Sequence, residues 1–114
     1  MWNVVATVEF DRWLSDQDTV CRQQFIRVVT LLRLSGPSLG RPYADTLKGS
    51  RFVNMKELRI NAKRLAIRIA FVFDPQRNAV LLVAGDKRGV SEQRFYRSLI
   101  DKADRLYTEY LTTR

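Results

Sequence analysis

The sequence contains no histidine and only one cysteine, and these two shortages exclude much of the common chemistry of small proteins. Without histidine there can be no Ser-His-Asp triad, and most zinc sites are excluded. Cys21 cannot form an internal disulfide, and its place among helical apolar positions predicts a core residue. No glycine-rich phosphate loop is present. We therefore expect neither a metal site nor a cofactor.

Long apolar runs are also lacking. The longest, Ala79–Ala84, is far too short to cross a bilayer. The opening Met1-Trp2-Asn3-Val4 has no basic stretch followed by an apolar block, so no signal peptide is expected. A chain of 114 residues with 46% hydrophobic residues has room for one domain, spanning residues 1–114, with one core. These features predict a cytoplasmic protein that does not bind a membrane.

Positive charge is concentrated in the middle of the chain. The formal net charge is +8, and residues 41–97 hold thirteen Lys and Arg but only five Asp and Glu. The two ends carry equal numbers of each sign and cancel. A basic middle predicts a positive face, and polyanions are the usual partners of such faces. A solvated face that only aids solubility is the alternative at this point.

Hydrophobic periodicity predicts an α+β domain with the element order β-α-α-β-β-β-α. Turn residues separate the elements, and Asp16 or Asp18 and Ser91 are suitable caps for the two longer helices. We expect a mostly antiparallel sheet, with a helical hairpin on one face and the last helix near the other face or at the sheet edge. The expected elements are a strand over Val4–Val8, helices over Phe10–Leu14 and from Asp16 or Asp18 to Leu34, a loop to Thr46, strands over Val53–Ile60, Leu65–Phe73 and Ala79–Ala84, and a helix from Ser91 to Leu111.

Strand alternation predicts a polar cluster on one face of this sheet. The odd positions of Leu65–Phe73 are apolar and must face a core, so Arg68 points the other way. Leu58 and Ile60 should face the same core, which places Glu57 and Arg59 on the face of Arg68. These three charges could form a structural cross-strand ion-pair cluster or a functional site, and spacing alone does not decide between them.

One reaction can be carried out by such residues without histidine. Cleavage of a phosphodiester within RNA requires that the 2′-hydroxyl lose a proton, that the charge on phosphorus be stabilised, and that the leaving 5′-oxygen gain a proton. Arginine and lysine can supply the stabilising charge, and a carboxylate or a tyrosine can move the protons.

Several short motifs along the chain resemble the RelE/ParE superfamily of toxins, in its HigB-like, phage-associated branch. The resemblance covers nearly the whole chain, and the order and spacing of the motifs carry it. The motifs are Leu47-Lys48-Gly49, Met55-Lys56-Glu57-Leu58-Arg59, Arg68 within an apolar strand, Gly85-Asp86-Lys87 at a strand end, and Arg94-Phe95-Tyr96 continuing to Ala103-Asp104.

The resemblance implies a metal-independent endoribonuclease that cuts mRNA on the ribosome and thereby inhibits translation. By position, Arg59 and Arg68 match arginines that bind the scissile phosphate, and Lys87 matches a residue that stabilises the transition state. Glu57 stands where a carboxylate general base occurs in some relatives. Tyr96 matches a tyrosine that stacks on a base or assists proton transfer. Because the segment between Lys87 and Tyr96 is longer than in RelE, a structural role for Tyr96 is equally open.

The same resemblance implies a helix-turn-helix antitoxin of the HigA type as partner, together with the ribosome and its mRNA. Further basic side chains are predicted to bind RNA, namely Lys48, Arg51, Lys63, Arg64 and Arg88. Three other functions stay open for the same fold. The protein could be a ParE-like poison of DNA gyrase, a non-catalytic nucleic-acid-binding module, or an inactive toxin kept as a scaffold for its antitoxin.

Overall fold

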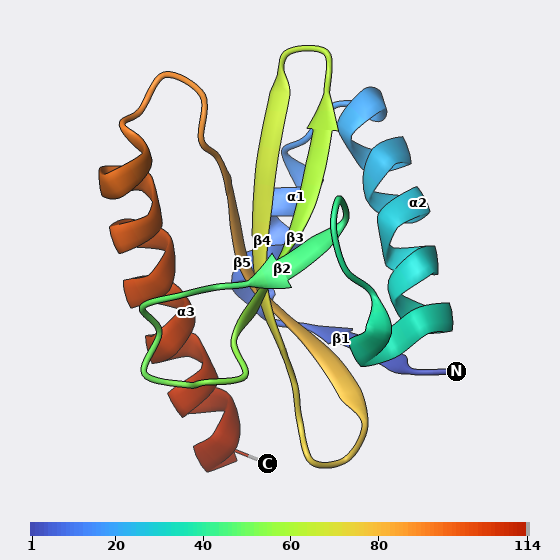
Figure 1. Cartoon of the computed structure of the whole chain (residues 1–114), viewed down its shortest axis with the longest axis vertical. Coiled ribbons are helices and arrows are strands. Elements are labelled where there is room, and N and C mark those ends of the chain that lie inside the picture. The colour runs from blue at the N-terminus through green and yellow to red at the C-terminus, as the bar shows by residue number, and fades with distance from the viewer. Residues whose placement is uncertain (114) are drawn as a thin grey trace.

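The computed structural model describes residues 1–113, and a five-stranded sheet lies between helices on both of its faces (Figure 1). The strand order is β1-β5-β4-β3-β2. β1 pairs with β5 in parallel, and all other neighbouring pairs are antiparallel. In chain order the elements are β1 (Asn3–Ala6), α1 (Val8–Ser15), α2 (Thr19–Ser35), the 3-10 helix η1 (Gly36–Ser38), β2 (Ala44–Thr46), β3 (Lys56–Ala62), β4 (Leu65–Phe73), β5 (Asn78–Asp86) and α3 (Glu92–Thr113). The predicted fold class and element order are confirmed.

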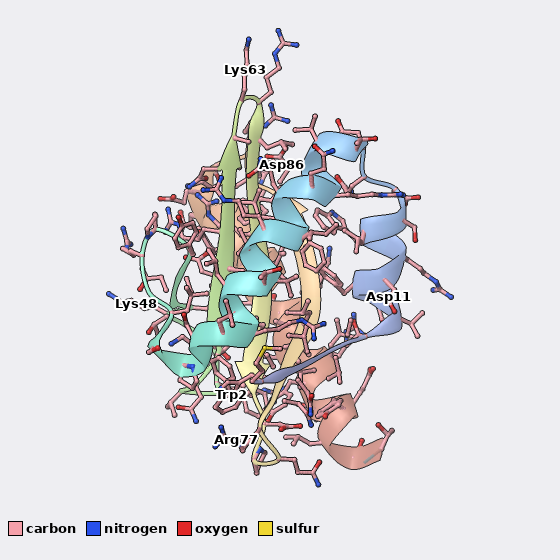
Figure 2. All side chains as sticks on the ribbon, turned by 90° about the vertical axis from the view of Figure 1, so that its right-hand side faces the viewer. Trp2, Asp11, Lys48, Lys63, Arg77 and Asp86 are labelled. Carbon is pink, nitrogen blue, oxygen red and sulfur yellow. The ribbon has the colours of Figure 1, made fainter. Side chains whose placement is uncertain are left out.

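The first core lies between the sheet and the α1–α2 hairpin, which Figure 2 shows face on. The odd positions of β4 point into it, as strand alternation predicts, together with Leu58 and Ile60 of β3. Phe10 of α1 and Cys21 of α2 are each 1% exposed in this core, so the predicted burial of the cysteine is confirmed.

The second core lies between the opposite face of the sheet and α3. Ala70 and Val72 of β4 pack here against Leu99 and Ala103 of α3. β5 contributes to both cores, because Leu81 faces the helical hairpin while its neighbours in the strand face α3. The last helix therefore covers the second face of the sheet, and β5 is covered on both sides as its apolar sequence predicts.

Two predicted boundaries shift. The strand expected over Val53–Ile60 is β3, which begins at Lys56 and ends at Ala62. Val53 lies in the preceding loop and is 88% exposed, and the backbone N–H of Met55 closes a turn on the carbonyl of Phe52. The turn itself falls at Lys63 and Arg64, where Arg64 takes a φ of 65°.

Two further expectations change at the sheet edges. The first strand ends at Ala6 rather than Val8, because Thr7 caps α1 by accepting a hydrogen bond from the N–H of Phe10. The segment expected to be loop up to Thr46 contains the edge strand β2, which pairs with the first residues of β3. Three residues are too few to produce an alternating pattern, so β2 forms through this pairing and not through its own sequence.

Candidate active site

Strand register brings the predicted cluster together on the α3 face. Arg59 of β3 lies directly opposite Arg68 of β4, and Glu57 lies opposite Ala70. Ala66 and Ala70, the neighbours of Arg68 on the same face of β4, have small side chains, which leaves room above the sheet for these charged side chains. The prediction that Glu57, Arg59 and Arg68 share one face is therefore confirmed.

The Glu57 carboxylate is the centre of the cluster and is 5% exposed. Its Oε1 accepts a hydrogen bond of 2.8 Å from the hydroxyl of Tyr96. The guanidinium of Arg59 lies 3.6 Å from Oε2, and Nε of Arg68 lies 3.9 Å from Oε1. The carboxylate thus has one short hydrogen bond and two cations just beyond hydrogen-bond distance.

Arg68 is buried beneath this carboxylate, with 2% of its surface exposed. Its Nη1 donates to Oδ1 of Asn61 and to the carbonyl oxygen of Ile67, both at 2.9 Å. Its Nε has no hydrogen-bond partner among residues 1–113. Strand alternation places Arg68 on the face opposite the first core, but α3 covers this face as well, so Arg68 is not available at the surface. Burying an arginine requires paired charge, and Glu57 supplies it.

Lys87 reaches the same face because of a bulge in β5. Ala70 of β4 pairs with Val83, but its neighbour Phe71 pairs with Leu81, so Leu82 is the extra residue. A bulge reverses the alternation of the residues that follow it. The backbone N–H of Lys87 bonds to the carbonyl of Ala66, and its ammonium group lies 3.0 Å from Oε1 of Glu92 on α3.

Tyr96 and Glu92 both come from the first turns of α3. The ring of Tyr96 packs edge-on against Phe95, while its hydroxyl reaches the sheet. Burial, and then the neighbouring Glu57 carboxylate, raise the pKa of the Tyr96 phenol above its ordinary value, although Arg68 opposes this effect. At neutral pH Tyr96 is therefore a hydrogen-bond donor. The Lys87 ammonium, and then the charges of Arg68 and Arg59, lower the pKa of the Glu92 carboxyl.

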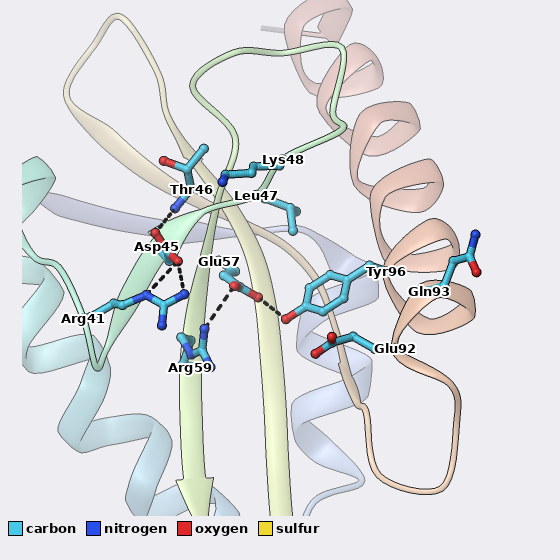
Figure 3. A pocket seen from close by; sticks show the side chains of 10 residues that line it. All are labelled: Arg41, Asp45, Thr46, Leu47, Lys48, Glu57, Arg59, Glu92, Gln93 and Tyr96. Atoms are coloured by element: carbon cyan, nitrogen blue, oxygen red, sulfur yellow. Dashed lines mark hydrogen bonds and ion pairs between the residues drawn. The ribbon is translucent and has the colours of Figure 1, made fainter.

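A cavity of about 470 Å³ opens above these groups (Figure 3). Arg59 and Glu57 form part of its wall, and Tyr96 projects into it from α3. Arg68 does not line the cavity but lies beneath Glu57. Lys87 contacts the cavity lining through its ion pair with Glu92. The complete lining consists of Arg41, Asp45, Thr46, Leu47, Lys48, Glu57, Arg59, Glu92, Gln93 and Tyr96.

Of the five predicted RNA-binding residues, only Lys48 lines this cavity. Lys63 and Arg64 lie at the tip of the β3–β4 hairpin, where Figure 2 shows Lys63 projecting beyond the sheet. Arg88 pairs with Asp86 at 2.7 Å. Arg51 lies over the ring of Phe52, with its guanidinium 5.8 Å from the ring centre.

The loop that carries Lys48 is fixed to α3. The hydroxyl of Ser50 and the backbone N–H of Arg51 both donate to the carboxylate of Asp104. Gly49 takes a φ of 98°, a conformation that glycine accepts without strain. Asp104 therefore holds one wall of the cavity in place.

Sequence reasoning missed six polar residues of this region: Arg41, Asp45, Thr46, Asn61, Glu92 and Gln93. Asn61 lies just beyond the strand expected over Val53–Ile60, and its place two residues after Arg59 on β3 is the signal that could have placed it on the same face. Glu92 and Gln93 belong to the first turn of α3, where an acidic residue is a common helix-start feature and reveals no site.

Residues 1–113 contain no group of three or more Cys, Asp or Glu side chains arranged to hold a metal ion. No helix in this part of the chain is both long and apolar enough to cross a membrane.

The fold and this site define a small α+β protein with a cavity on one sheet face that is lined by side chains of both charges. The family of phage-derived proteins described as Gp49-like matches residues 12–108. The chain therefore belongs to the Gp49-like family. Together with the relatives and solved structures that follow, this membership confirms the resemblance to RelE/HigB-type toxins seen in its motifs.

Two curated relatives come from Mycobacterium tuberculosis. The toxin candidate HigB2 is 41% identical over 100 residues, covering 87% of this chain and 49% of the relative. The toxin candidate HigB3 is 37% identical over 110 residues, covering 96% of this chain and 94% of the relative. The chain thus spans about half the length of the first relative and nearly all of the second.

Solved structures of Escherichia coli toxin RelE share the fold. A double arginine-to-alanine mutant in the free state has a TM-score of 0.64 at 10% identity, covering 89% of this chain and 95% of that chain. The isolated toxin has a TM-score of 0.52 at 9% identity, covering 89% of this chain and 97% of that chain. At such low identity the likeness establishes the fold alone.

Proposed function

We propose that this protein is the toxin of a toxin–antitoxin pair and inhibits translation by cutting mRNA on the ribosome. The observation that carries the proposal is the convergence of Glu57, Arg59 and Tyr96 on one cavity, with Arg68 beneath it and Lys87 at its rim. A purely structural ion-pair cluster would not require an open cavity above the carboxylate. Membership of the Gp49-like family, with relatives described as toxins, supports the same function.

In the proposed reaction, Glu57 accepts the proton of the attacking 2′-hydroxyl. The 2′-oxygen bonds to phosphorus, the bond from phosphorus to the 5′-oxygen breaks, and a 2′,3′-cyclic phosphate and a free 5′-hydroxyl result. Tyr96 donates a proton to the leaving 5′-oxygen, because its raised pKa keeps the phenol protonated at neutral pH and its hydroxyl projects into the cavity. The hydrogen bond between Tyr96 and Glu57 then returns the proton from Glu57 to the tyrosinate.

The cations around the cavity would stabilise the negative charge of the scissile phosphate. Arg59 borders the cavity directly and would contact the scissile phosphate. Lys87 would turn from Glu92 to the charge that develops on phosphorus. Arg68, because it is buried, is assigned the role of holding Glu57 and adding positive charge from below. These side chains fill every role in the reaction, so we propose that it needs no metal.

We further propose that the protein acts in the cytoplasm and is silenced by a helix-turn-helix antitoxin of the HigA type. A toxin whose reactive groups face an open cavity must have that cavity covered or distorted to be kept inactive. A small helix-turn-helix open reading frame next to the gene would support this partner.

The decisive experiment is induction of the protein in growing bacteria without its antitoxin. Incorporation of labelled amino acids should stop before incorporation of labelled thymidine, and mRNA cut within translated codons should accumulate. If DNA synthesis stops first and gyrase-linked breaks appear, the protein is a gyrase poison of the ParE type. If both syntheses continue, it is not a toxin of either kind.

A further inference from the structure

A second, smaller cleft of about 120 Å³ lies between α2 and the edge of β3. Its lining contains two guanidinium groups and two carboxamide groups but no carboxylate. This composition distinguishes it from the larger cavity, whose wall includes three carboxylates. The cleft is lined by Gln24, Arg27, Val28, Pro42, Tyr43, Arg59, Ile60 and Asn61.

Arg27 supplies a cation without a protein partner. It is exposed on α2, and its guanidinium makes no hydrogen bond or ion pair with residues 1–113. The next residue, Val28, is 4% exposed in the core, so the backbone beneath Arg27 is held by packing. An arginine with all its donors available, at a cleft free of acids, favours an anionic ligand.

Arg59 connects the cleft to the larger cavity, because its side chain borders both. Its carboxylate partner Glu57 is 3.6 Å away, beyond ordinary hydrogen-bond distance, so its donors are not fully used. Its backbone N–H donates to the carbonyl of Tyr43 at 2.8 Å, which fixes the far wall of the cleft to β3. A polyanionic chain that crosses Arg59 would therefore pass from one cavity into the other.

The size of the cleft limits its occupant. A cleft of about 120 Å³ that opens to solvent has room for a phosphate group, while the rest of a bound strand can lie outside it. Arg27, Arg59 and the carboxamide of Asn61 can each donate hydrogen bonds to phosphate oxygens.

We propose that this cleft binds the backbone phosphate adjacent to the scissile one. The RNA strand would then run from the larger cavity over Arg59 into the cleft, where Arg27 binds the adjacent phosphate. The proposal rests on the proposed ribonuclease function and extends its substrate site by one phosphate. Arg27 is a binding residue in this arrangement and takes no part in bond cleavage.

The test measures binding of fluorescein-labelled RNA by anisotropy, using substrates whose 2′-oxygen at the cleavage position is replaced by hydrogen. One oligonucleotide carries only the scissile phosphate, and two others carry one additional phosphate on the 5′ or the 3′ side. One of the extensions should strengthen binding to the wild-type protein several-fold. Arg27→Gln should lose this gain, and the salt slope for the extended RNA should fall by about 0.7.

Arg33→Gln is the matched control, because Arg33 is exposed on the same helix and does not line the cleft. It removes the same charge and should keep the gain from the extension. If both variants weaken binding equally, only the general positive field matters and the phosphate site is wrong. If neither variant changes the gain, the RNA does not reach Arg27 and the proposal fails.

Two outcomes separate this proposal from the proposed function. Binding of the single-phosphate RNA without any gain from extension would overturn the cleft proposal alone. No binding of any RNA, on or off ribosomes, would overturn both. Titration with inorganic phosphate, followed by the NMR signal of Arg27 Nε–H, identifies the anion source. A shift with free phosphate but not with extended RNA would mean that the cleft binds a free anion, which contradicts the proposal.

Discussion

Lys87 lies one residue beyond the end of β5, and its ammonium group contacts Glu92 at the start of α3. No packing contact requires a cation at this position, whereas a developing charge on phosphorus would. The contrast with Arg68 is informative, because Arg68 is buried against Glu57 and cannot be removed without leaving a buried carboxylate less well paired. Lys87 is therefore the better residue for testing chemistry apart from stability.

We expect Lys87→Ala to abolish detectable mRNA cleavage on ribosomes while the melting temperature stays near that of the wild type. Removing one preorganised charge at a reacting centre typically costs about 3–4 kcal/mol, or about two to three decades in rate. Lys87→Arg should keep part of the activity, because the charge remains while its hydrogen-bond geometry changes. Cleavage rates on programmed ribosomes and thermal melting are the two measurements.

Lys102→Ala is the control, since Lys102 is an exposed lysine of α3 that does not line the cavity. It should cut mRNA at nearly the wild-type rate. Full activity in Lys87→Ala would show that the assignment of Lys87 to the transition state is wrong.

Strand alternation was sufficient to predict which charged residues share the α3 face. It could not predict the burial of Arg68, because that burial depends on α3 packing over the strand. It also could not predict that Lys87 lies on the α3 face. Simple alternation along β5 from Val80 would place Lys87 on the hairpin face, and only the extra residue at Leu82 reverses it. No residue type in Ala79–Ala84 marks a bulge.

At the scale of elements, the β4–β5 turn is tied to the C-terminal part of α3 by one buried carboxylate. Asp74 is 5% exposed and accepts hydrogen bonds from the backbone of Gln76 and Asn78 and from the hydroxyl of Tyr110, the last at 2.7 Å. Burial alone would raise the pKa of this carboxyl, but the hydrogen bonds outweigh it and hold the pKa below its ordinary value.

We expect Asp74→Asn to lower the free energy of unfolding by about 1.5–3 kcal/mol at neutral pH, because hydrogen bonds to a charged acceptor are lost. A carboxyl whose pKa is lowered in the folded state stabilises the protein above its unfolded pKa of about 3.9. That contribution disappears as the pH falls through the lowered folded value. The penalty of the variant should therefore shrink in acid, which urea unfolding at neutral and acidic pH measures.

Asp101→Asn serves as the reference, because Asp101 is exposed on the same helix and makes no hydrogen bond or ion pair with residues 1–113. Its unfolding free energy should follow that of the wild type at each pH. A penalty for Asp74→Asn that is equal at neutral and acidic pH would contradict the role assigned to the charge.

The helices and strands were predicted correctly where a hydrophobic pattern repeats over many residues, as in α2, β4 and α3. The prediction failed where pairing with a distant segment decides the structure. β2 has three residues and exists because Ala44, Asp45 and Thr46 pair with the start of β3. This short strand matters for function, since Asp45 and Thr46 form one wall of the cavity.

On the scale of the whole molecule, the two faces of the sheet present different surfaces. The α3 face carries the cavity, whose lining holds charges of both signs, and the opposite face is covered by α1 and α2, on which Val8, Ile26 and Leu34 are each at least 59% exposed. A groove of about 320 Å³ between these helices is lined by Leu14, Ser15, Arg22, Phe25 and Ile26. An antitoxin could therefore neutralise the protein through charge on one side or through apolar contact on the other.

The net positive charge of residues 41–97, which supply the whole cavity lining, leads us to expect that an acidic or amphipathic antitoxin segment binds on the α3 face. Affinity should then fall steeply as salt rises, because ions screen exposed charges over about 8–10 Å at physiological ionic strength. Calorimetry of the toxin–antitoxin complex at low and high salt measures this slope. Ile26→Asp on α2 should leave the affinity unchanged. A complex insensitive to salt but weakened by Ile26→Asp would place the antitoxin on the helical hairpin, and inhibition would then result from blocked entry to the ribosome and not from a covered cavity.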